Sequence, residues 1–265
     1  MPALDGRTIA LLESRRGAEL DALVRQAGGT PVRAASVREV ARPDDVARFA
    51  EGLAGDRFEV VVFLTGAGVH ALLDESLDGT VAALRRCTVA SRGPKPLAAL
   101  KRYGVAAHVM TAKPHTSDEL VDAVARVDLD RRRVALVHYG ERNPSLSAAL
   151  RGMGARVTDI CAYEWMLPDD VEPLILLVDR MLAGDVDALL VTSQIQYRHL
   201  CEVAARVDRE QRLNVALRTD VVVAAIGPIC ADAIRRSGVI PDVMPETPNL
   251  PSLVRALGDY FELIG

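Results

Sequence analysis

Short, wholly apolar runs alternate with amphipathic stretches along the chain, and two of these runs end in the same way. Val60–Leu64 and Ala188–Val191 contain no polar residue, which is typical of strands buried on both faces of a parallel sheet. Each run is followed by a hydroxyl-bearing residue, Thr65 or Ser193, and then by a segment that can be helical. The first backbone N–H groups of a helix have no partner within it and bind anions readily. The pattern therefore predicts two similar strand–turn–helix corners, each suited to an anionic ligand.

The order of elements occurs twice, which indicates an internal duplication. Three pairs of segments match in order and spacing: Thr8–Leu12 with Arg133–Val137, Pro43–Val46 with Pro168–Val171, and Val89–Met110 with Val223–Met244. The second pair reads Pro-Asp-Asp-Val in both copies, and we expect each copy to open a helix. Matches that keep one spacing through a strand, a turn and a helix seldom arise by chance.

The alternation of strands and helices predicts an α/β fold with two similar domains. Each domain is expected to have a parallel sheet of about five strands with helices on both faces. Ligands of such sheets bind outside the carboxyl ends of the strands, where the strand order reverses. This rule selects six segments: Ser14–Arg16, Thr65–Gly68, Ser91–Gly93, His138–Gly140, Ser193–Gln194 and Gly227–Pro228. Two such edges that face each other would form a ligand cleft between the domains.

Composition narrows the class of ligand. A net charge of −4 and an aromatic content of 4% argue against a nucleic-acid-binding surface. The four cysteines have no metal or redox spacing, and the five histidines form no close pair, so we expect no metal site. No apolar run approaches the ~20 residues that span a bilayer. A small anionic ligand remains compatible with this chain, because basic residues and helix termini act locally.

The segment Gly66–Ala71 fits the G-x-G-x-x-A dinucleotide fingerprint after a strand. The acidic residue expected about 20 positions later is absent, and Ser91-Arg92 ends the next strand instead. The matching corner at Ser193 has no glycine. A site for NADP is therefore the weaker interpretation of these glycines.

Several further residues are candidates because they lie at expected strand ends or crossovers. Basic side chains there could bind carboxylates or phosphates, although each alone is more often a solvated surface charge. Tyr163, which lies shortly before Pro168, could donate a proton or hydrogen bond into a cleft, but an aromatic residue packed beside a linker fits equally well.

A series of motifs spans the chain: GRTIALLESRRGAEL, VVFLTGAGV, VALVHYGERNPSL, the crossover with Tyr163, ALLVTSQIQ and VAAIGPICADAIRRSGV. In this order and spacing they resemble the uroporphyrinogen-III synthase family, over essentially the whole chain. The resemblance implies two flavodoxin-like domains joined by a two-stranded linker. One domain would comprise residues 1–36 and 169–265, the other residues 41–162, with linkers at about 37–40 and 163–168. A simple tandem division near Asp130 fits the repeat equally well, and we follow the family.

The resemblance also implies an activity. The family's enzymes close hydroxymethylbilane with loss of water and inversion of ring D, which gives uroporphyrinogen III for haem, sirohaem, cobalamin or chlorophyll biosynthesis. Such a hydro-lyase would need no cofactor and no metal, and would work as a cytoplasmic monomer supplied by hydroxymethylbilane synthase. We expect neither nucleic acid nor membrane as a partner.

By the same resemblance, Tyr163 assists departure of the substrate's hydroxyl group as a hydrogen-bond donor or general acid. The residues that would hold the substrate are Arg15, Thr65, Gly66, Ala67, Gly68, Ser91, Arg92, Gly93, Tyr139, Gly140, Ser193, Gln194 and Gly227. The family often has threonine after its Gly-Pro turn, whereas this chain has Ile229, so contacts there would use backbone amides. A non-catalytic tetrapyrrole or anion sensor of the same fold is the alternative function.

Overall fold

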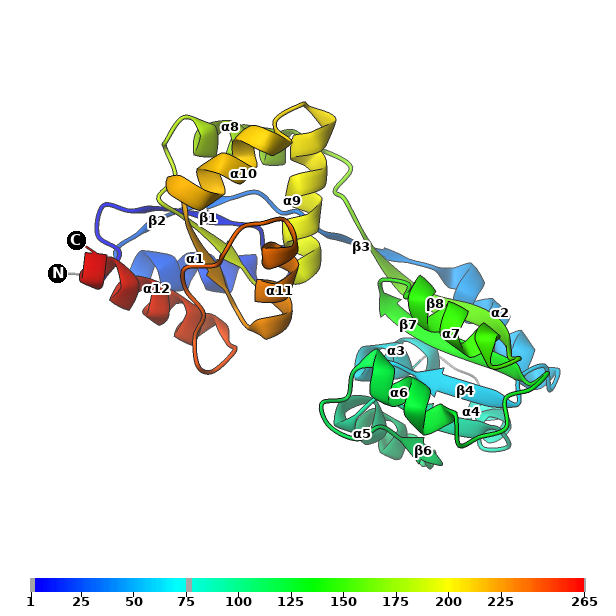
Figure 1. Cartoon of the computed structure of the whole chain (residues 1–265). Coiled ribbons are helices and arrows are strands. Elements are labelled where there is room, and N and C mark those ends of the chain that lie inside the picture. The colour runs from blue at the N-terminus through cyan, green and yellow to red at the C-terminus, as the bar shows by residue number, and fades with distance from the viewer. Residues whose placement is uncertain (1–2, 75–77, 265) are drawn as a thin grey trace. The chain divides into compact units, whose positions relative to one another are not determined.

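The computed structural model describes residues 3–74 and 78–264, with the side chains of Asp78 and Tyr139 outside the described part. The chain divides into two compact units. Unit 1 comprises residues 1–38 and 166–265, and unit 2 comprises residues 39–165. Each unit has its own sheet, built mainly of parallel strands, with helices on both faces, so the expected α/β fold class is confirmed (Figure 1).

Unit 1 has a four-stranded sheet in the order β10-β9-β1-β2. Its strands are β1 (Thr8–Leu11), β2 (Thr30–Arg33), β9 (Ala188–Val191) and β10 (Val222–Ala225). Its helices are α1 (Gly17–Gln26), α8 (Glu172–Leu182), α9 (Gln194–Arg206), α10 (Glu210–Thr219), α11 (Pro228–Arg236) and α12 (Leu250–Ile264). One apolar cluster joins α8 to α11 with one face of the sheet, and a second joins α1 and α12 with the other face.

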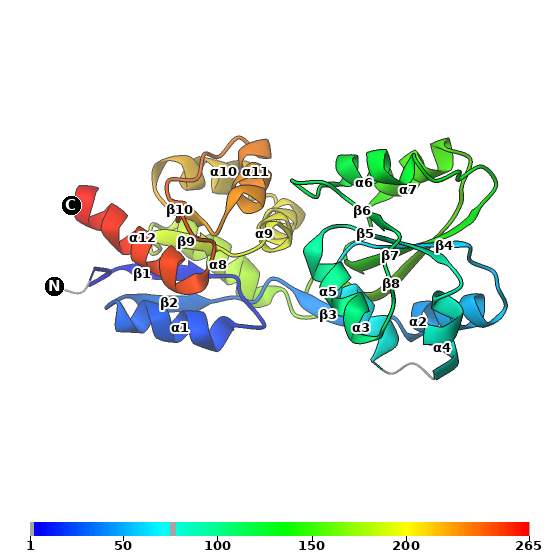
Figure 2. The ribbon, with the colours of Figure 1, turned by 90° about the horizontal axis from the view of Figure 1, so that it is seen from below.

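Unit 2 has a six-stranded sheet in the order β3-β8-β7-β4-β5-β6. Its strands are β3 (Arg38–Ala41), β4 (Val60–Phe63), β5 (Thr88–Ser91), β6 (Val109–Met110), β7 (Arg133–Gly140) and β8 (Arg156–Met166). Its helices are α2 (Pro43–Ala54), α3 (Gly66–Leu73), α4 (Asp78–Leu84), α5 (Pro94–Arg102), α6 (Ser117–Val124) and α7 (Pro144–Gly152). Helices α2 to α5 pack on one face of this sheet and α6 and α7 on the other, as Figure 2 shows.

The strands divide their side chains between these two layers because successive residues of a strand point to opposite faces. In β4, Val61 and Phe63 join the cluster with α2 to α5, whereas Val60 and Val62 join the cluster with α6 and α7. All four residues are buried, so an uninterrupted apolar run is what this central strand requires.

Two expectations about the elements were wrong in detail. The second Pro-Asp-Asp-Val segment does not open a helix, because α8 begins only at Glu172, whereas α2 begins at Pro43 as expected. The units have four and six strands instead of about five each. In unit 1, Val243 makes an isolated bridge to Ala224 instead of a strand, since Pro241 and Pro245 on either side have no N–H to donate.

Candidate functional site

Each sheet reverses its strand order at one point, and the loops there diverge to opposite faces. In unit 2 the reversal lies between β7 and β4, which lead into α7 and α3. In unit 1 it lies between β1 and β9, which lead into α1 and α9. Divergent loops leave a crevice at the carboxyl ends of the strands, which is the usual ligand position in this architecture. The two carboxyl edges are therefore the candidate ligand positions.

The two hydroxyl-capped corners expected from the sequence are both present. The Thr65 side chain accepts a hydrogen bond from the Gly68 N–H at 3.0 Å and so caps α3. The Ser193 side chain caps α9 by accepting from the Gln196 N–H at 3.4 Å, and the Gln196 amide oxygen accepts from the Ser193 N–H at 3.2 Å. The hydroxyl groups therefore fix the first turn of each helix, and an anion at either corner would meet the backbone amides of that turn.

Packing accounts for the glycines of the Thr65 corner. A Cβ atom on Gly66 would lie 3.0 Å from the carbonyl oxygen of Lys95, because the first turn of α5 packs against it. A Cβ atom on Gly68 would lie 3.2 Å from the Thr65 hydroxyl and 3.4 Å from the carbonyl oxygen of His138. These close backbone approaches explain both glycines without a nucleotide, which weakens the NADP interpretation further.

The neighbouring β5 turn carries two polar residues, Ser91 and Arg92. Ser91 is fully buried, and its hydroxyl donates to the Gly93 carbonyl at 3.0 Å, so it shapes the turn. Gly93 has φ +87°, and a Cβ atom there would lie 3.0 Å from the His115 ring. Glycine is thus required for both conformation and space.

Arg92 is the residue at this edge most suited to an anion. Its guanidinium is half-buried and has no hydrogen-bond or ion-pair partner within the described residues. Burial lowers the pKa of Arg92 from its ordinary value, which shows that the surroundings do not compensate its charge. A cation held in this way favours an anionic ligand that completes its hydrogen bonds.

The β7 edge combines a buried histidine with a conformationally special glycine. His138 Nδ1 accepts from the Asn143 N–H at 3.3 Å, so Nε2 carries the proton and donates to Asp159 at 2.8 Å. Burial lowers the pKa of His138 despite the opposing effect of Asp159, so the ring is neutral near pH 7. Gly140 has φ +82° beside an irregularity in the β7–β8 pairing. The Tyr139 side chain lies outside the described part of the chain.

His138, Asp159 and Ser147 form a Ser–His–Asp set without the geometry of a catalytic triad. The Ser147 hydroxyl and the His138 ring both donate to the same Asp159 oxygen, while Arg151 donates to the other oxygen at 2.9 Å. A nucleophilic serine needs the histidine as its base, and here the carboxylate takes that place. The group is a structural network that anchors the end of β7.

Glu13 organises the carboxyl edge of unit 1, and the sequence analysis missed it. One carboxylate oxygen accepts from the Arg15 N–H at 3.1 Å and from the Arg16 N–H, within its own loop. The other accepts from the Thr192 hydroxyl and from the Gln196 side chain at 3.1 Å, at the β9 corner. Glu13 directly follows the first matched strand, as His138 follows the second. This shared position in the repeat could have identified it.

We expect Glu13→Gln to lower the stability of unit 1 by about 1–2 kcal/mol at pH 7, because a neutral amide accepts these hydrogen bonds less strongly. Burial alone would raise the pKa of Glu13, but the hydrogen bonds from Thr192, Gln196 and the two backbone amides hold it below its usual value. A depressed folded-state pKa stabilises the fold above the unfolded pKa of about 4.3, and this contribution is lost as the pH falls further.

The difference in unfolding free energy between Glu13→Gln and the wild-type protein should therefore decrease below about pH 4.3. Urea unfolding followed by circular dichroism at several pH values measures it. Glu19→Gln is the matched control, since Glu19 is an exposed partner of Arg16 in the same region and should change little. A difference that stayed constant with pH would contradict a role for the Glu13 charge.

Tyr163 lies near the end of β8, where the backbone is held on both sides. The Arg42 N–H donates to the Ala162 carbonyl at 2.8 Å, and Arg42 and Arg142 both pair with Glu164. A cavity of about 420 Å³ reaches this residue, and its wall includes Pro43, Leu72 and Thr80. In the strand order, β7 lies between β8 and β4, the strand that precedes Thr65. About 10 Å of sheet therefore separates β8 from β4. The structure thus offers Tyr163 an open, mostly apolar space within unit 2.

The remaining expected residues lie on the edge of unit 1. Arg15 is exposed in the β1–α1 loop, and Gln194 is the half-buried first residue of α9. Gly227 precedes α11 in an extended conformation that other residues also adopt. The structure therefore gathers Arg15, Ser193, Gln194 and Gly227 on one carboxyl edge, and Thr65–Gly68, Ser91–Gly93 and Gly140 on the other.

The described part of the chain contains neither a candidate metal site nor a candidate membrane-spanning helix. Within residues 3–74 and 78–264, no group of three His, Cys, Asp or Glu side chains could hold a metal ion. Among the same residues, no helix is both long and apolar enough to cross a bilayer.

Two α/β units of one topology, each with a capped corner at its strand-order reversal, define the two-domain flavodoxin-like class. Residues 18–255 match the family described as uroporphyrinogen-III synthase HemD. The chain belongs to this family.

The chain is also similar, over more than nine-tenths of its length, to curated proteins and solved structures. The chain is 29% identical to the putative uroporphyrinogen-III synthase of Methanothermobacter thermautotrophicus, over 91% of this chain and 93% of that protein. It is 28% identical to the uncharacterized protein YjjA of Bacillus subtilis, over 97% of both. A crystal structure of mutant uroporphyrinogen III synthase from Thermus thermophilus superposes with a TM-score of 0.79 at 27% identity, covering 98% of this chain and all of that one. The crystal structure of uroporphyrinogen-III synthetase from Helicobacter pylori has the same fold as this chain, with a TM-score of 0.54 at 14% identity.

Proposed function

We propose that the protein is a uroporphyrinogen-III synthase, which cyclises hydroxymethylbilane with loss of water and inversion of ring D. The observation that carries this proposal is the half-buried Arg92 on a carboxyl edge, whose guanidinium has no partner among the described residues, within a chain whose family is established over residues 18–255. The proposal places the protein in tetrapyrrole biosynthesis, as a cytoplasmic monomer after the enzyme that makes hydroxymethylbilane.

The substrate's carboxylates suit the groups found on each carboxyl edge. The first-turn amides of α3, α5, α9 and α11 lie at these edges, and helix N-termini favour negative charge. Arg92 adds a guanidinium whose planar fork matches a carboxylate. These local contacts explain how a chain with a net charge of −4 can bind a polyanion.

The chemistry that we propose relies on orientation. Departure of the terminal hydroxyl group as water leaves an electron-poor carbon that ring D attacks through its substituted position, and the spiro intermediate then rearranges. Without the protein, hydroxymethylbilane closes to the type I isomer. The protein's contribution is therefore to hold ring D in the required orientation. Tyr163 donates a hydrogen bond or proton to the departing hydroxyl group.

The test is to give hydroxymethylbilane to the purified protein and to separate the two isomers after oxidation. We expect the type III isomer, formed faster than the spontaneous product. Type I alone, at the spontaneous rate, would reject the proposal and favour a tetrapyrrole sensor of this fold.

Tyr163→Phe is expected to lower kcat by about 10- to 100-fold, at or below the low end of what a general acid contributes, because the hydroxyl group also departs spontaneously. KM and thermal stability should change little. Tyr103→Phe is the matched control, since Tyr103 lies in the same unit and its hydroxyl group makes hydrogen bonds with His70 and Asp74. Equal rates for Tyr163→Phe and the wild-type protein would remove Tyr163 from the mechanism.

A further inference from the structure

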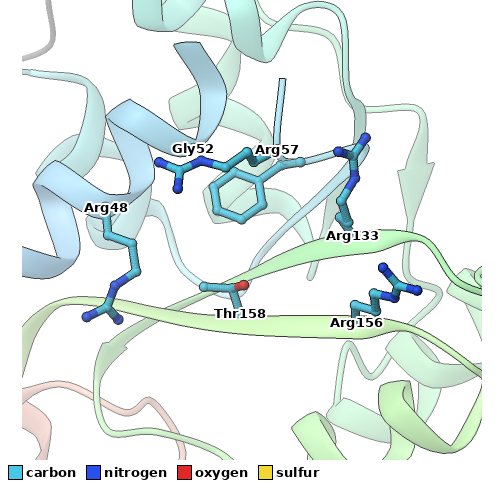
Figure 3. A pocket seen from close by; sticks show the side chains of 7 residues that line it. Arg48, Gly52, Arg57, Arg133, Arg156 and Thr158 are labelled. Carbon is cyan, nitrogen blue, oxygen red and sulfur yellow. The ribbon is translucent and has the colours of Figure 1, made fainter. Parts of the chain in front are cut away.

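A second cavity lies at the opposite edge of the unit 2 sheet, at the amino ends of β7 and β8. It has a volume of about 450 Å³ and is lined by Arg48, Gly52, Arg57, Phe58, Arg133, Arg156 and Thr158 (Figure 3). Arg133 and Arg156 are the first residues of their strands. The carboxyl edge described above therefore plays no part in this cavity.

The cavity wall contains four arginines and no acidic residue. Arg133 and Arg156 are direct neighbours in the β7–β8 register, so two like charges lie side by side, an arrangement that is destabilising without compensation. Glu59 compensates Arg133 at 3.1 Å but also pairs with Arg132. Arg156 has no ion-pair or hydrogen-bond partner for its side chain among the described residues.

The carboxylates that pair with the other two arginines lie outside the cavity wall. Arg48 pairs with Asp45 at 2.9 Å, and Asp45 is shared with Arg142. Arg57 lies 3.6 Å from Glu51, and both side chains are exposed. An exposed pair such as Arg57–Glu51 is weak and readily exchanges for a better anion. The cavity thus presents an excess of positive charge to any ligand.

The rest of the wall is mostly apolar. A Cβ atom on Gly52 would lie 2.2 Å from the Phe58 ring, so the ring rests directly on the backbone of α2. Thr158 adds a side chain from near the start of β8, which Figure 3 shows between Arg48 and Arg156. A ligand here would meet an apolar surface surrounded by guanidinium groups, which also stack on flat rings.

We propose that this cavity binds a small organic anion that carries at least two carboxylate or phosphate groups on a flat apolar ring. The guanidinium forks bind the anionic groups, and Phe58 and Thr158 contact the ring. The cavity's volume lies in the range of small-molecule sites. This proposal does not depend on the synthase reaction.

The test is titration calorimetry of the full-length protein with benzene-1,3,5-tricarboxylate at 0.15 M salt. We expect saturable binding that Arg156→Gln weakens at least tenfold. Arg126→Gln is the matched control, because Arg126 is an exposed arginine of the same unit, and it should leave the affinity unchanged. Thermal unfolding confirms that both variants are folded.

Two comparisons identify the site and the ligand class. Citrate carries three carboxylates without a ring and should bind more weakly. Titrations with pyrophosphate and with a phosphate ester of a flat ring compare phosphate binding with carboxylate binding. Absence of saturable binding would overturn the proposal. Binding that is lost in Arg92→Gln but kept in Arg156→Gln would also overturn it, since the ligand would then lie at the carboxyl edge. Equal affinity for citrate would refute the role of the apolar wall.

Discussion

Replacing Arg92 with glutamine is expected to lower kcat/KM for hydroxymethylbilane by about 10- to 100-fold, mainly through KM. A hydrogen bond to a charged group contributes about 1.5–3 kcal/mol, and each 1.4 kcal/mol corresponds to a factor of ten. Arg92 meets the conditions for such a contact, because it is half-buried and no described residue pairs with its guanidinium. Steady-state kinetics with isomer analysis measures the effect.

The same substitution should leave the melting temperature unchanged or raise it, because glutamine removes an uncompensated charge from a half-buried position. Arg92→Lys keeps the charge but loses the planar fork and should give an intermediate KM. A melting temperature that fell by several degrees together with activity would contradict a binding role and indicate a structural one. Arg126→Gln again serves as the control for a lost surface charge.

Replacing Gly140 with alanine is expected to destabilise unit 2 by about 3 kcal/mol. Its φ of +82° is unfavourable for any residue with a Cβ atom, and that atom would lie 2.2 Å from the Trp165 ring. Either the indole or the end of β7 must therefore move. Trp165 is the chain's one tryptophan, so urea unfolding followed by its fluorescence reports on unit 2 directly.

Gly104→Ala separates the two causes of this destabilisation. Gly104 also has a positive φ, +63°, but a Cβ atom there would meet only the end of the flexible Arg85 side chain. We expect a loss of about 1 kcal/mol, which corresponds to the backbone conformation alone. Equal losses for the two variants would show that contact with Trp165 contributes nothing.

The sequence predicted those features that depend on local patterns. Thr65 and Ser193 were identified as corner residues because each follows shortly after a buried strand at the start of a helical segment, and each caps its helix. The repeat identified which loops lie at the carboxyl edges. Parallel sheets with helices on both faces followed from the apolar runs.

Features that depend on partners distant in the sequence could not be predicted. Glu13 joins its own loop to Thr192 across almost 180 residues, and its neighbours in the sequence give no sign of this. Ser91 has a hydroxyl at the expected edge, yet that hydroxyl donates within its own turn. The second Pro-Asp-Asp-Val copy has the composition of a helix start, but composition does not determine which residue begins the helix.

The discontinuity of unit 1 has a consequence for the order in which the chain folds during synthesis. Unit 2 is one uninterrupted segment, residues 39–165, and all of its strands are available once that segment has left the ribosome. Strand β1, in contrast, must wait for β9, its neighbour in the sheet, which is made only after unit 2 is complete. The apolar residues of β1 and α1 therefore remain without β9 and α12, which complete their cluster, throughout that interval. Sequence-distant pairing of this kind folds slowly and is exposed to aggregation. The amino-terminal segment is thus the part of the nascent chain most in need of protection.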